Sequence, residues 1–377
     1  MQKILINGLQ LGDENTGVQY YTKNLYEELN KIETENFKFH LIRSPVSSQL
    51  SICFRSSKNN RLKRICFENF FLPAYLRKNN YNLYHSPNYV LPYFLYFPSV
   101  LTIHDLITLN FPQFCQFKSV LYFRLFLPNS IKKATKIIAV SYKVKEDILR
   151  RFNIYPDKIE VVYQGVNPIF KKIRDKGILS KTRDKYYLPD QFLLFVGNIE
   201  PKKNLVRLIR AFDILRKTIE LEHKLVIVGK KGWKYNSVFK TIDKLKIGNE
   251  IIFTGYVPEE DLPAIYSMAD LFVFPSLYEG FGIPPLEAMA CETPVLVSNK
   301  GALPETTGGK CLQVNPYDIN DIAKGINTLL TDEALRTKTI ENCKKWVKDF
   351  TWERAARQTI KVYERILFRD VLRKSEN

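Results

Sequence analysis

Short apolar segments alternate with amphipathic ones along the chain, in two series. The first series contains six segments of strand length, KILING (3–8), FKFHLI (37–42), YNLYHS (81–86), SVLTIHD (99–105), TKIIAVS (135–141) and KIEVVYQG (158–165). The second contains QFLLFVGN (191–198), HKLVIVGK (223–230), EIIFTGY (250–256), ADLFVFPS (269–276), TPVLVSN (293–299) and CLQVN (311–315). Near-continuous Val, Ile, Leu and Phe runs separated by helical stretches predict parallel sheets covered on both faces.

Between the two series, residues 167–190 are charged and lack strong periodicity. We interpret this segment as an interdomain linker, with the boundary near residues 168–188. The chain of 377 residues is long enough for two domains, which we place at 1–170 and 185–354. In doubly wound domains a substrate binds at the carboxyl ends of the strands, so we expect it in a cleft between the two.

The composition, 45% hydrophobic and 25% charged, is that of a soluble globular protein. The six cysteines form no CxxC pair, which favours reduced thiols in a cytoplasmic protein. The N-terminal residues lack the features of a signal peptide. The longest apolar runs, such as 89–101, are interrupted by proline and fall short of the about 20 residues that span a bilayer.

The net charge of +18 favours an anionic partner: nucleic acid, an anionic membrane surface or a phosphorylated small molecule. Residues 55–84 interleave basic and aromatic side chains, a pattern typical of peripheral contact with an anionic membrane. A solvated basic face with its aromatic rings turned into the core explains the same pattern, and both interpretations stay open.

Two carboxylates, Glu279 and Glu287, are separated by seven residues that include two glycines and two prolines. Proline is favoured at the start of a helix, so Pro284 and Pro285 predict that a helix begins there. The free amides of a helix start attract anionic or electron-rich groups. We expect Glu279 to face the cleft and Glu287, in the first turn, to accept hydrogen bonds from a ribose diol. The alternative is an ordinary loop carboxylate and a first-turn acid that favours the helix dipole.

This E-x7-E element strongly resembles the one in retaining glycosyltransferases of family four. Further segments resemble the family in the right order and cover nearly the whole chain: LQLGDENTGVQYYTKNLYEEL, VLTIHDLITLNFP, IIAVSYKVKEDILRRFNIYPDKIEVVYQGVNPIF, LLFVGNIEPKKNLVRLIRAF and KGALPETTGG. The resemblance implies an α/β protein of the GT-B fold, in which two Rossmann-like doubly wound domains face each other across a cleft. The first would bind the acceptor and the second the nucleotide-sugar donor. The C-terminal helix, about 355–377, would cross back to the first domain.

The resemblance also assigns roles in donor binding. Glu279 would contact the donor sugar and act in catalysis. The backbone amides of Phe281, Gly282 and Ile283 would bind sugar hydroxyls or phosphate. Glu287 would hold the ribose of the nucleotide.

Other residues match the family outside this element. Lys203 would neutralise the diphosphate, and Gly17 would close on the donor phosphates from an N-terminal glycine loop. His104 would lie beside the reacting sugar, where we assign it positioning and electrostatics rather than the role of an obligatory general base. Tyr256 and Val257 would edge the nucleobase. Glu279, His104 and Lys203 are therefore the candidate catalytic residues.

The phosphate site departs from the family pattern at one position. Many members carry arginine directly after the strand-ending glycine, where this chain has Asn198. Lys202 could replace part of the missing charge, or its side chain could point into solvent.

The implied reaction is transfer of a hexose from a nucleotide-sugar to a glycan or lipid-linked acceptor in cell-surface polysaccharide or lipopolysaccharide synthesis, with retention. Likeness to bacterial mannosyltransferases in TIHDLITLNFP and GNIEPKKNL favours mannose from GDP-mannose. Lysine and backbone amides would stabilise the leaving diphosphate. With no D-x-D-like pair at a strand end, we expect neither a metal nor a cofactor.

Two other classes of protein remain as alternatives. One is a different enzyme on this scaffold, such as a nucleotide-sugar epimerase or a phosphorylase. The other is a nucleic-acid-binding protein, suggested only by the charge and unsupported by any recognisable module. We expect no nucleic-acid partner and a cytoplasmic location. Association with the inner face of the cytoplasmic membrane stays open.

Overall fold

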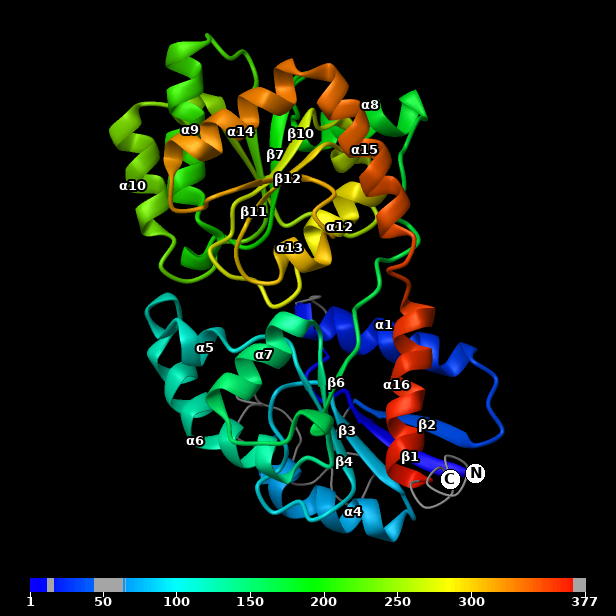
Figure 1. Cartoon of the computed structure of the whole chain (residues 1–377). Helices are drawn as coiled ribbons and strands as arrows, with labels where there is room; N and C mark the ends of the chain where they lie inside the picture. Colours follow the sequence, from blue (N-terminus) through cyan, green and yellow to red (C-terminus); the bar gives the residue numbers. More distant parts are fainter. Residues whose placement is uncertain (12–16, 44–63, 65, 369–377) are drawn as a thin grey trace. The chain divides into compact units, whose positions relative to one another are not determined.

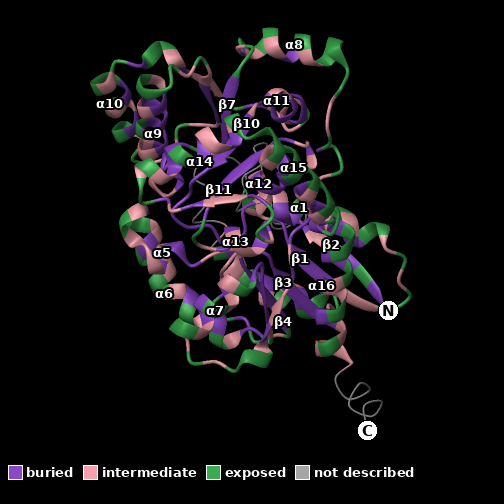
Figure 2. Cartoon of the chain, turned by 45° about the horizontal axis from the view of Figure 1, so that its top comes forward, coloured by how far each residue is buried: buried purple, intermediate pink, exposed green. Residues whose placement is uncertain are grey.

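The computed structural model describes residues 1–11, 17–43, 64 and 66–368. The chain forms two compact units (Figure 1). The first comprises residues 1–110, 117–165 and 351–377, and the second comprises residues 111–116 and 166–350. Each unit is built on one parallel sheet with helices on its two faces, and in both sheets the strands are largely buried (Figure 2).

The sheet of the first unit has six parallel strands in the order β2-β1-β3-β4-β5-β6. The six apolar segments expected in this half each provide one strand: β1 (Gln2–Asn7), β2 (Phe37–Ile42), β3 (Leu83–Ser86), β4 (Ser99–Ile103), β5 (Lys136–Ala139) and β6 (Ile159–Val161). Among the described residues its helical elements are α1 (Gly17–Lys31), η1 (Phe67–Phe71), α4 (Leu72–Lys78), α5 (Ile107–Asn110), α6 (Phe117–Lys133), α7 (Tyr142–Arg151), η3 (Pro156–Lys158) and α16 (Trp352–Leu367).

Helix α16 belongs to the core of this first unit although it comes from the other end of the chain. Its buried residues Trp352, Ala356 and Tyr363 lie in one apolar cluster with Tyr21 and Leu25 of α1. The buried, mostly apolar residues of α16 lie along one side of the helix, and that side covers the sheet beside α1 (Figure 1).

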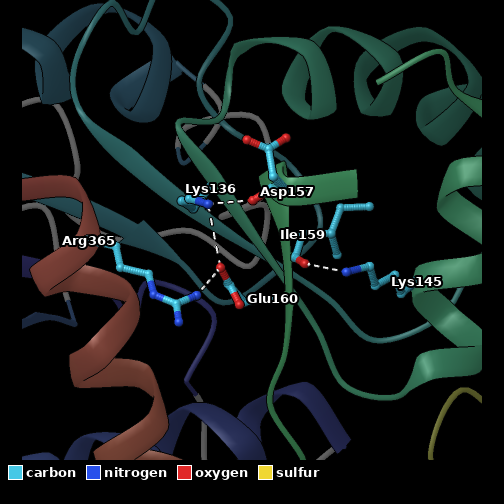
Figure 3. A network of polar contacts seen from close by, with 6 residues as sticks. All are labelled: Lys136, Lys145, Asp157, Ile159, Glu160 and Arg365. Atoms are coloured by element: carbon cyan, nitrogen blue, oxygen red, sulfur yellow. Dashed lines mark hydrogen bonds and ion pairs between the residues drawn. The ribbon is translucent and has the colours of Figure 1, made fainter. Parts of the chain in front are cut away.

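A polar network ties the last turns of α16 to the edge of the sheet (Figure 3). The guanidinium of Arg365 and the ammonium of Lys136 both contact Glu160 Oε1, the latter at 3.4 Å. Lys136 also donates to the carbonyl of Asp157, and Lys145 of α7 donates to the carbonyl of Ile159 at 2.9 Å. Of these contacts, the partly exposed ion pair of Arg365 with Glu160 joins α16 to β6, and pairs of this kind add little to stability.

The second unit has a six-stranded parallel sheet in the order β12-β11-β10-β7-β8-β9. Its strands again coincide with the expected apolar segments: β7 (Phe192–Val196), β8 (Lys224–Val228), β9 (Ile251–Gly255), β10 (Leu271–Phe274), β11 (Val295–Ser298) and β12 (Leu312–Val314). The order turns back between β7 and β10, and ligands of doubly wound sheets bind beyond the carboxyl ends of strands at such a reversal.

Helical segments cover both faces of this second sheet. They are η2 (Pro112–Phe114), α8 (Lys176–Tyr186), η4 (Pro201–Lys203), α9 (Leu205–Thr218), α10 (Asn236–Leu245), η5 (Gly248–Glu250), α11 (Leu262–Met268), α12 (Ile283–Ala290), α13 (Leu303–Thr306), α14 (Ile319–Thr331) and α15 (Glu333–Val347).

The segment 167–190, expected to be a linker, is instead part of the second unit and contains α8. Asp175 caps the helix by accepting a hydrogen bond from the amide of Ile178. Lys172 donates to the carbonyl of Ser267 at 2.8 Å, before the helix begins. Thr182 is the only residue of α8 that is buried (Figure 2). Because the helix is mostly exposed and charged, its sequence shows almost no periodic pattern of apolar residues.

Besides the short segment 111–116, the chain passes into the second unit after Gly165 and returns to the first at Thr351. A Cβ on Gly165 would lie 2.2 Å from the backbone nitrogen of Trp352, so the two passages touch at a position that only glycine can occupy. Within the described ranges, no helix combines the length and apolar composition needed to cross a bilayer.

Candidate active site

The E-x7-E element lies at the carboxyl end of β10, in the loop that leads into α12. Gly282 is the residue before the helix and has φ +100°, a conformation that side chains with a Cβ rarely adopt. A Cβ there would also lie 2.5 Å from Leu303 Cδ2. Glycine is therefore favoured here by the φ of the turn, and a Cβ would also displace the end of the Leu303 side chain.

A second loop holds the element from the other side. The amide of Ala302 donates to the carbonyl of Glu279 at 2.9 Å, and Thr306 Oγ1 donates to the carbonyl of Phe281 at 2.9 Å. Gly301, at φ +64°, packs so closely that a Cβ would lie 2.7 Å from Glu279 O. The segment KGALPETTGG thus fixes the backbone of the E-x7-E loop, a role that its sequence did not reveal.

Glu279 and two lysines form a buried charged cluster at this edge of the sheet. Lys203 Nζ lies 2.8 Å from Glu279 Oε1, and Lys202 Nζ lies 3.7 Å from Glu279 Oε2. Lys203 also lies over the ring of Phe274, 4.7 Å from its centroid. Burial by itself would raise the pKa of Glu279, but the charges of Lys202 and Lys203 outweigh it and lower that pKa. The carboxylate is therefore charged at neutral pH.

The lysines reach Glu279 because β7 and β10 are neighbours in the sheet. They lie on the short turn η4 that follows β7, and the amide of Leu277 donates to the carbonyl of Lys202 at 2.8 Å. Asn204, at φ +63°, donates from Nδ2 to the carbonyls of Pro275 and Pro316 at 3.0 and 2.6 Å. The structure thus brings together the predicted residues Glu279, Lys202 and Lys203. It also shows that the side chain of Lys202 points toward Glu279, with Glu200 as a second acidic neighbour at 3.9 Å.

Glu287 lies in the second turn of α12, not in the first turn as expected, because the helix begins at Ile283 and its first turn contains no acid. The carboxyl is buried and accepts a hydrogen bond from Tyr266 Oη at 2.8 Å. Burial raises its pKa to about 8. Glu287 is thus largely protonated at neutral pH. The helix-dipole explanation, which needs a charged first-turn acid, does not apply.

Asn198 and Tyr256 are exposed at the carboxyl ends of β7 and β9, and Val257 beside Tyr256 is buried. Lys230, just beyond the end of β8, was not predicted from the sequence to belong here. Its Nζ lies 4.5 Å from the centroid of the Tyr256 ring. The backbone is tightly packed here, since a Cβ on Gly229 would lie 2.1 Å from Gly197 O.

Gly17 and His104 belong to the first unit. Gly17 is exposed and begins α1, and residues 12–16 of the expected glycine loop lie outside the described residues. His104 follows β4 and lies edge-on to Tyr21, with ring centroids 4.7 Å apart. Its Nε2 is 2.9 Å from the carbonyl of Pro87, which can only accept, so Nε2 carries hydrogen and Nδ1 of the neutral ring is an acceptor. Burial lowers the pKa of His104, although the residue as a whole is not fully buried.

A buried polar group near His104 was missed in the sequence. His85 is fully buried, with Nδ1 2.7 Å from Tyr363 Oη and Nε2 2.8 Å from Thr102 Oγ1. Burial lowers the pKa of His85 to about 3, so the ring is neutral. Thr102 Oγ1 lies 3.4 Å from Tyr21 Oη, and the ring of Tyr21 in turn contacts His104. Helix α16 is thus linked to the surroundings of His104 within the first unit.

Only part of the basic and aromatic stretch 55–84 can be placed. Residues 55–63 and 65 lie outside the described residues. In the remainder, Phe67, Leu72 and Leu76 are buried, whereas Phe70 and Phe71 are exposed. Some aromatic side chains of this stretch thus lie in the core and others face solvent, and contact with a membrane stays a prediction.

The sequence matches two protein-family models, one after the other. The model described as "Glycosyltransferase Family 4" matches residues 16–169, and that described as "Glycosyl transferases group 1" matches residues 181–346. The "O-antigen chain mannosyltransferase B" of Escherichia coli is 33% identical over 283 residues, covering 75% of this chain and 74% of that protein. The "Serotype-specific mannosyltransferase WbdA" of the same species is 32% identical over 71% of this chain, which spans only 34% of that longer protein.

Among solved structures, Anabaena Alr3699/HepE in complex with UDP-glucose superposes with a TM-score of 0.73. It is 18% identical, over 97% of this chain and all of that chain. At this identity the likeness concerns the fold, and it agrees with two Rossmann-like units of the GT-B fold. The family models and the 33% identical relative show that this chain belongs to the family-four glycosyltransferases.

Proposed function

We propose that this protein is a retaining glycosyltransferase that moves a hexose, mannose from GDP-mannose, to a glycan or lipid-linked acceptor during synthesis of a cell-surface polysaccharide. Membership of the family supports the glycosyl transfer. The mannose and the polysaccharide are supported by the names of the two relatives, a chain mannosyltransferase and a serotype-specific mannosyltransferase. The nucleotide-sugar is supported by the UDP-glucose bound to a structural neighbour.

The observation that carries the proposal is the buried cluster of Glu279, Lys202 and Lys203 beside the reversal of strand order. Breaking the anomeric C–O bond leaves positive charge on the sugar ring and additional negative charge on the diphosphate. In our proposal Lys203, with the amides of Phe281, Gly282 and Ile283 at the start of α12, stabilises the diphosphate. Side chains and amides would then provide the neutralisation, so transfer is expected to continue in the presence of a strong chelator.

Glu279 has two tasks in this mechanism. Before the donor binds, the carboxylate of Glu279 holds Lys203 in the site. The ion pair compensates the charge of the Lys203 ammonium, which is nearly buried. When the diphosphate arrives, Lys203 can share its donors with the phosphate oxygens, and Glu279 can accept hydrogen bonds from sugar hydroxyls. Because its pKa is lowered, the carboxylate stays charged and stabilises the ring as that becomes cationic.

We propose that Glu287 holds the ribose. The protonated carboxyl can donate one hydrogen bond and accept another, which suits a diol with two hydroxyls. Tyr256 and Val257 would edge the nucleobase, with Lys230 beside the tyrosine ring. Asn198 would contact the diphosphate without charge, so Lys202 and Lys203 supply the positive charge there.

On the acceptor side, neutral His104 would offer Nδ1 to a hydroxyl of the reacting sugar. Gly17 would close on the donor phosphates. In front-face attack the leaving phosphate takes the proton of the acceptor hydroxyl as the new bond forms on the side that the diphosphate leaves. That route needs no protein nucleophile.

The test is a thermal-shift screen of GDP-, UDP- and ADP-sugars against the purified protein. A donor at 100 times its dissociation constant should add about 2.7 kcal/mol to the free energy of unfolding. We expect GDP-mannose to give the largest shift, followed by transfer of mannose to an extracted lipid-linked acceptor. Stabilisation by a UDP-sugar alone would overturn the donor assignment, and no response to any nucleotide-sugar would overturn the proposed function.

A further inference from the structure

Residues 111–116 make a short excursion out of the first unit. They form the turn η2 between α5 and α6, yet they belong to the second unit, whereas both helices belong to the first. Segments that follow one another along a chain usually pack together. The excursion therefore indicates that specific contacts hold this turn on the second unit.

The loop after β8 donates hydrogen bonds to the backbone of the turn. The indole N–H of Trp233 donates to the carbonyl of Phe114, and Lys234 Nζ donates to the carbonyl of Gln113 at 2.8 Å. The last carbonyls of a helical turn have no partner within the turn itself. Donors from the second unit thus satisfy the end of η2.

The loop that carries Trp233 is itself fixed to the chain beyond β7. The amide of Gly232 donates to the carbonyl of Ile199 at 3.1 Å, and the amide of Ile199 donates to the carbonyl of Lys230 at 2.9 Å. A Cβ on Gly232 would lie 2.9 Å from Ile199 O, so the two segments are in close contact. Trp233 is therefore a well-supported anchor for η2.

Phe111, at the start of this turn, places its ring on the residue before Glu279. The centroid of the partly buried Phe111 ring lies 5.2 Å from that of Tyr278 and 5.9 Å from that of Phe114. Tyr278 is buried. Aromatic rings at such spacings attract each other beyond the gain from burial alone. Phe111 thus restrains the side chain of Tyr278.

The position of Tyr278 bears directly on the orientation of Glu279. Backbone hydrogen bonds hold the chain on either side of Tyr278, from the amide of Leu277 to the carbonyl of Lys202 and from the amide of Ala302 to the carbonyl of Glu279. The tyrosine lies between these two points. Its ring contact with Phe111 is therefore a further restraint on the direction in which the Glu279 carboxylate points.

We propose that Phe111 is a positioning residue of the transfer reaction, which holds Glu279 in its reactive orientation through Tyr278, and that Trp233 anchors Phe111 for this task. The role rests on the proposed function, in which Glu279 stabilises the sugar ring as that becomes cationic. Such a charge must be held closely, because a small displacement of a catalytic group costs much of the rate. Binding of the diphosphate by Lys203 depends less on this orientation.

The first test compares turnover with donor affinity in variants of Phe111. Phe111→Ala should lower turnover about fivefold, because Glu279 is then less well oriented. The calorimetric dissociation constant of the donor should change by less than about twofold. Phe111→Tyr keeps the ring and should retain the wild-type rate. A contact that only adds stability would lower the denaturation midpoint and leave turnover unchanged.

A double-variant cycle shows whether Phe111 acts through Glu279. In the Glu279→Gln background, Phe111→Ala should lower turnover by less than a further factor of about two, since the charge to be oriented is already gone. Trp233→Phe, which keeps a ring but removes the N–H bonded to Phe114, should lower turnover about twofold by loosening the anchor.

Hydrogen exchange tests the restraint without any donor. In Phe111→Ala the peptide 277–282 should exchange about threefold faster or more, because the loop opens more often. The matched control is Tyr75→Ala, which removes a partly buried ring 6.0 Å from that of Tyr81, just before β3 in the first unit. It should leave the turnover and the exchange of this peptide unchanged.

Three results would overturn the inference while leaving the proposed function intact. They are a wild-type turnover for Phe111→Ala, unchanged exchange of peptide 277–282 in that variant, and losses for Phe111→Ala and Glu279→Gln that multiply in the double variant. Failure of the wild-type protein to bind any nucleotide-sugar would overturn the proposed function, and with it the role of Phe111. That failure is recognised before any variant is measured.

Discussion

At the scale of single residues, Glu279 and Lys203 form one charged pair but should contribute to different steps. Glu279→Gln keeps the shape of the side chain and removes its charge. Because that charge matters most when the sugar ring is cationic, we expect turnover to fall about tenfold or more and donor affinity to change little. Lys203→Ala should lower both turnover and donor affinity. The diphosphate is already negatively charged in the bound donor, so Lys203 acts on it before the reaction begins. Calorimetric dissociation constants beside transfer rates make the comparison.

A wild-type rate for Glu279→Gln would contradict the role assigned to this carboxylate. The matched control is Glu292→Gln, because Glu292 makes ion pairs with Arg174 and Lys344 away from this cluster. That variant should leave both quantities unchanged.

The buried carboxyl of Glu287 should make the stability of the protein depend on pH. Its pKa is about 8 in the folded chain against an ordinary value of 4.5, so between these values the folded state holds a proton that the unfolded state has lost. Stability should therefore fall as pH rises through this window, by up to about 1.4 kcal/mol per unit from this group. Glu287→Gln cannot titrate and should gain stability over the wild type as pH rises. Urea unfolding of both proteins at about pH 5 and about pH 8 measures the difference, and a constant difference would refute the assignment.

At the scale of elements, the E-x7-E loop depends on Gly282. Gly282→Ala meets both an unfavourable φ and Leu303 Cδ2 at 2.5 Å, so it should cost about 1–3 kcal/mol and weaken donor binding. Gly248→Ala is the control, since its nearest neighbour would be 4.0 Å away. Chemical unfolding and the nucleotide-sugar thermal shift measure the two effects. Equal stability of the two variants would show that the loop is not constrained in this way.

The hydrogen bond between Tyr363 of α16 and His85 should contribute to stability. Tyr363→Phe removes the hydroxyl bonded to His85 Nδ1 and leaves a fully buried ring nitrogen without that partner. We expect a loss of about 1–3 kcal/mol in unfolding free energy. Tyr187→Phe, at a tyrosine that is 85% exposed, should have almost no effect. If the two variants unfold at the same denaturant concentration, the bond between α16 and His85 contributes nothing to stability.

The strands could be predicted from the sequence because each is a short, nearly continuous apolar run whose signal is local. The start of α12 was predictable for the same reason, from Pro284 and Pro285. The pairing of Lys203 with Glu279 depends on β7 lying beside β10, and no local pattern records the order of strands in a sheet. The raised pKa of Glu287 likewise comes from burial, which follows only from packing. Helix α8 was missed because it buries almost none of its surface.

At the scale of the whole molecule, helix α16 affects the order in which the chain can fold during synthesis. The ribosome releases all six strands of the first unit and then the entire second unit before α16 appears. Until then the nascent first unit lacks Trp352, Ala356 and Tyr363, and the apolar side chains of Tyr21 and Leu25 stay without that cover. The second unit needs no later segment of the chain. Domains usually fold in the order of their synthesis, but here the part made first stays incomplete until the end. We therefore expect the second unit to fold first and the first unit to depend more on a chaperone.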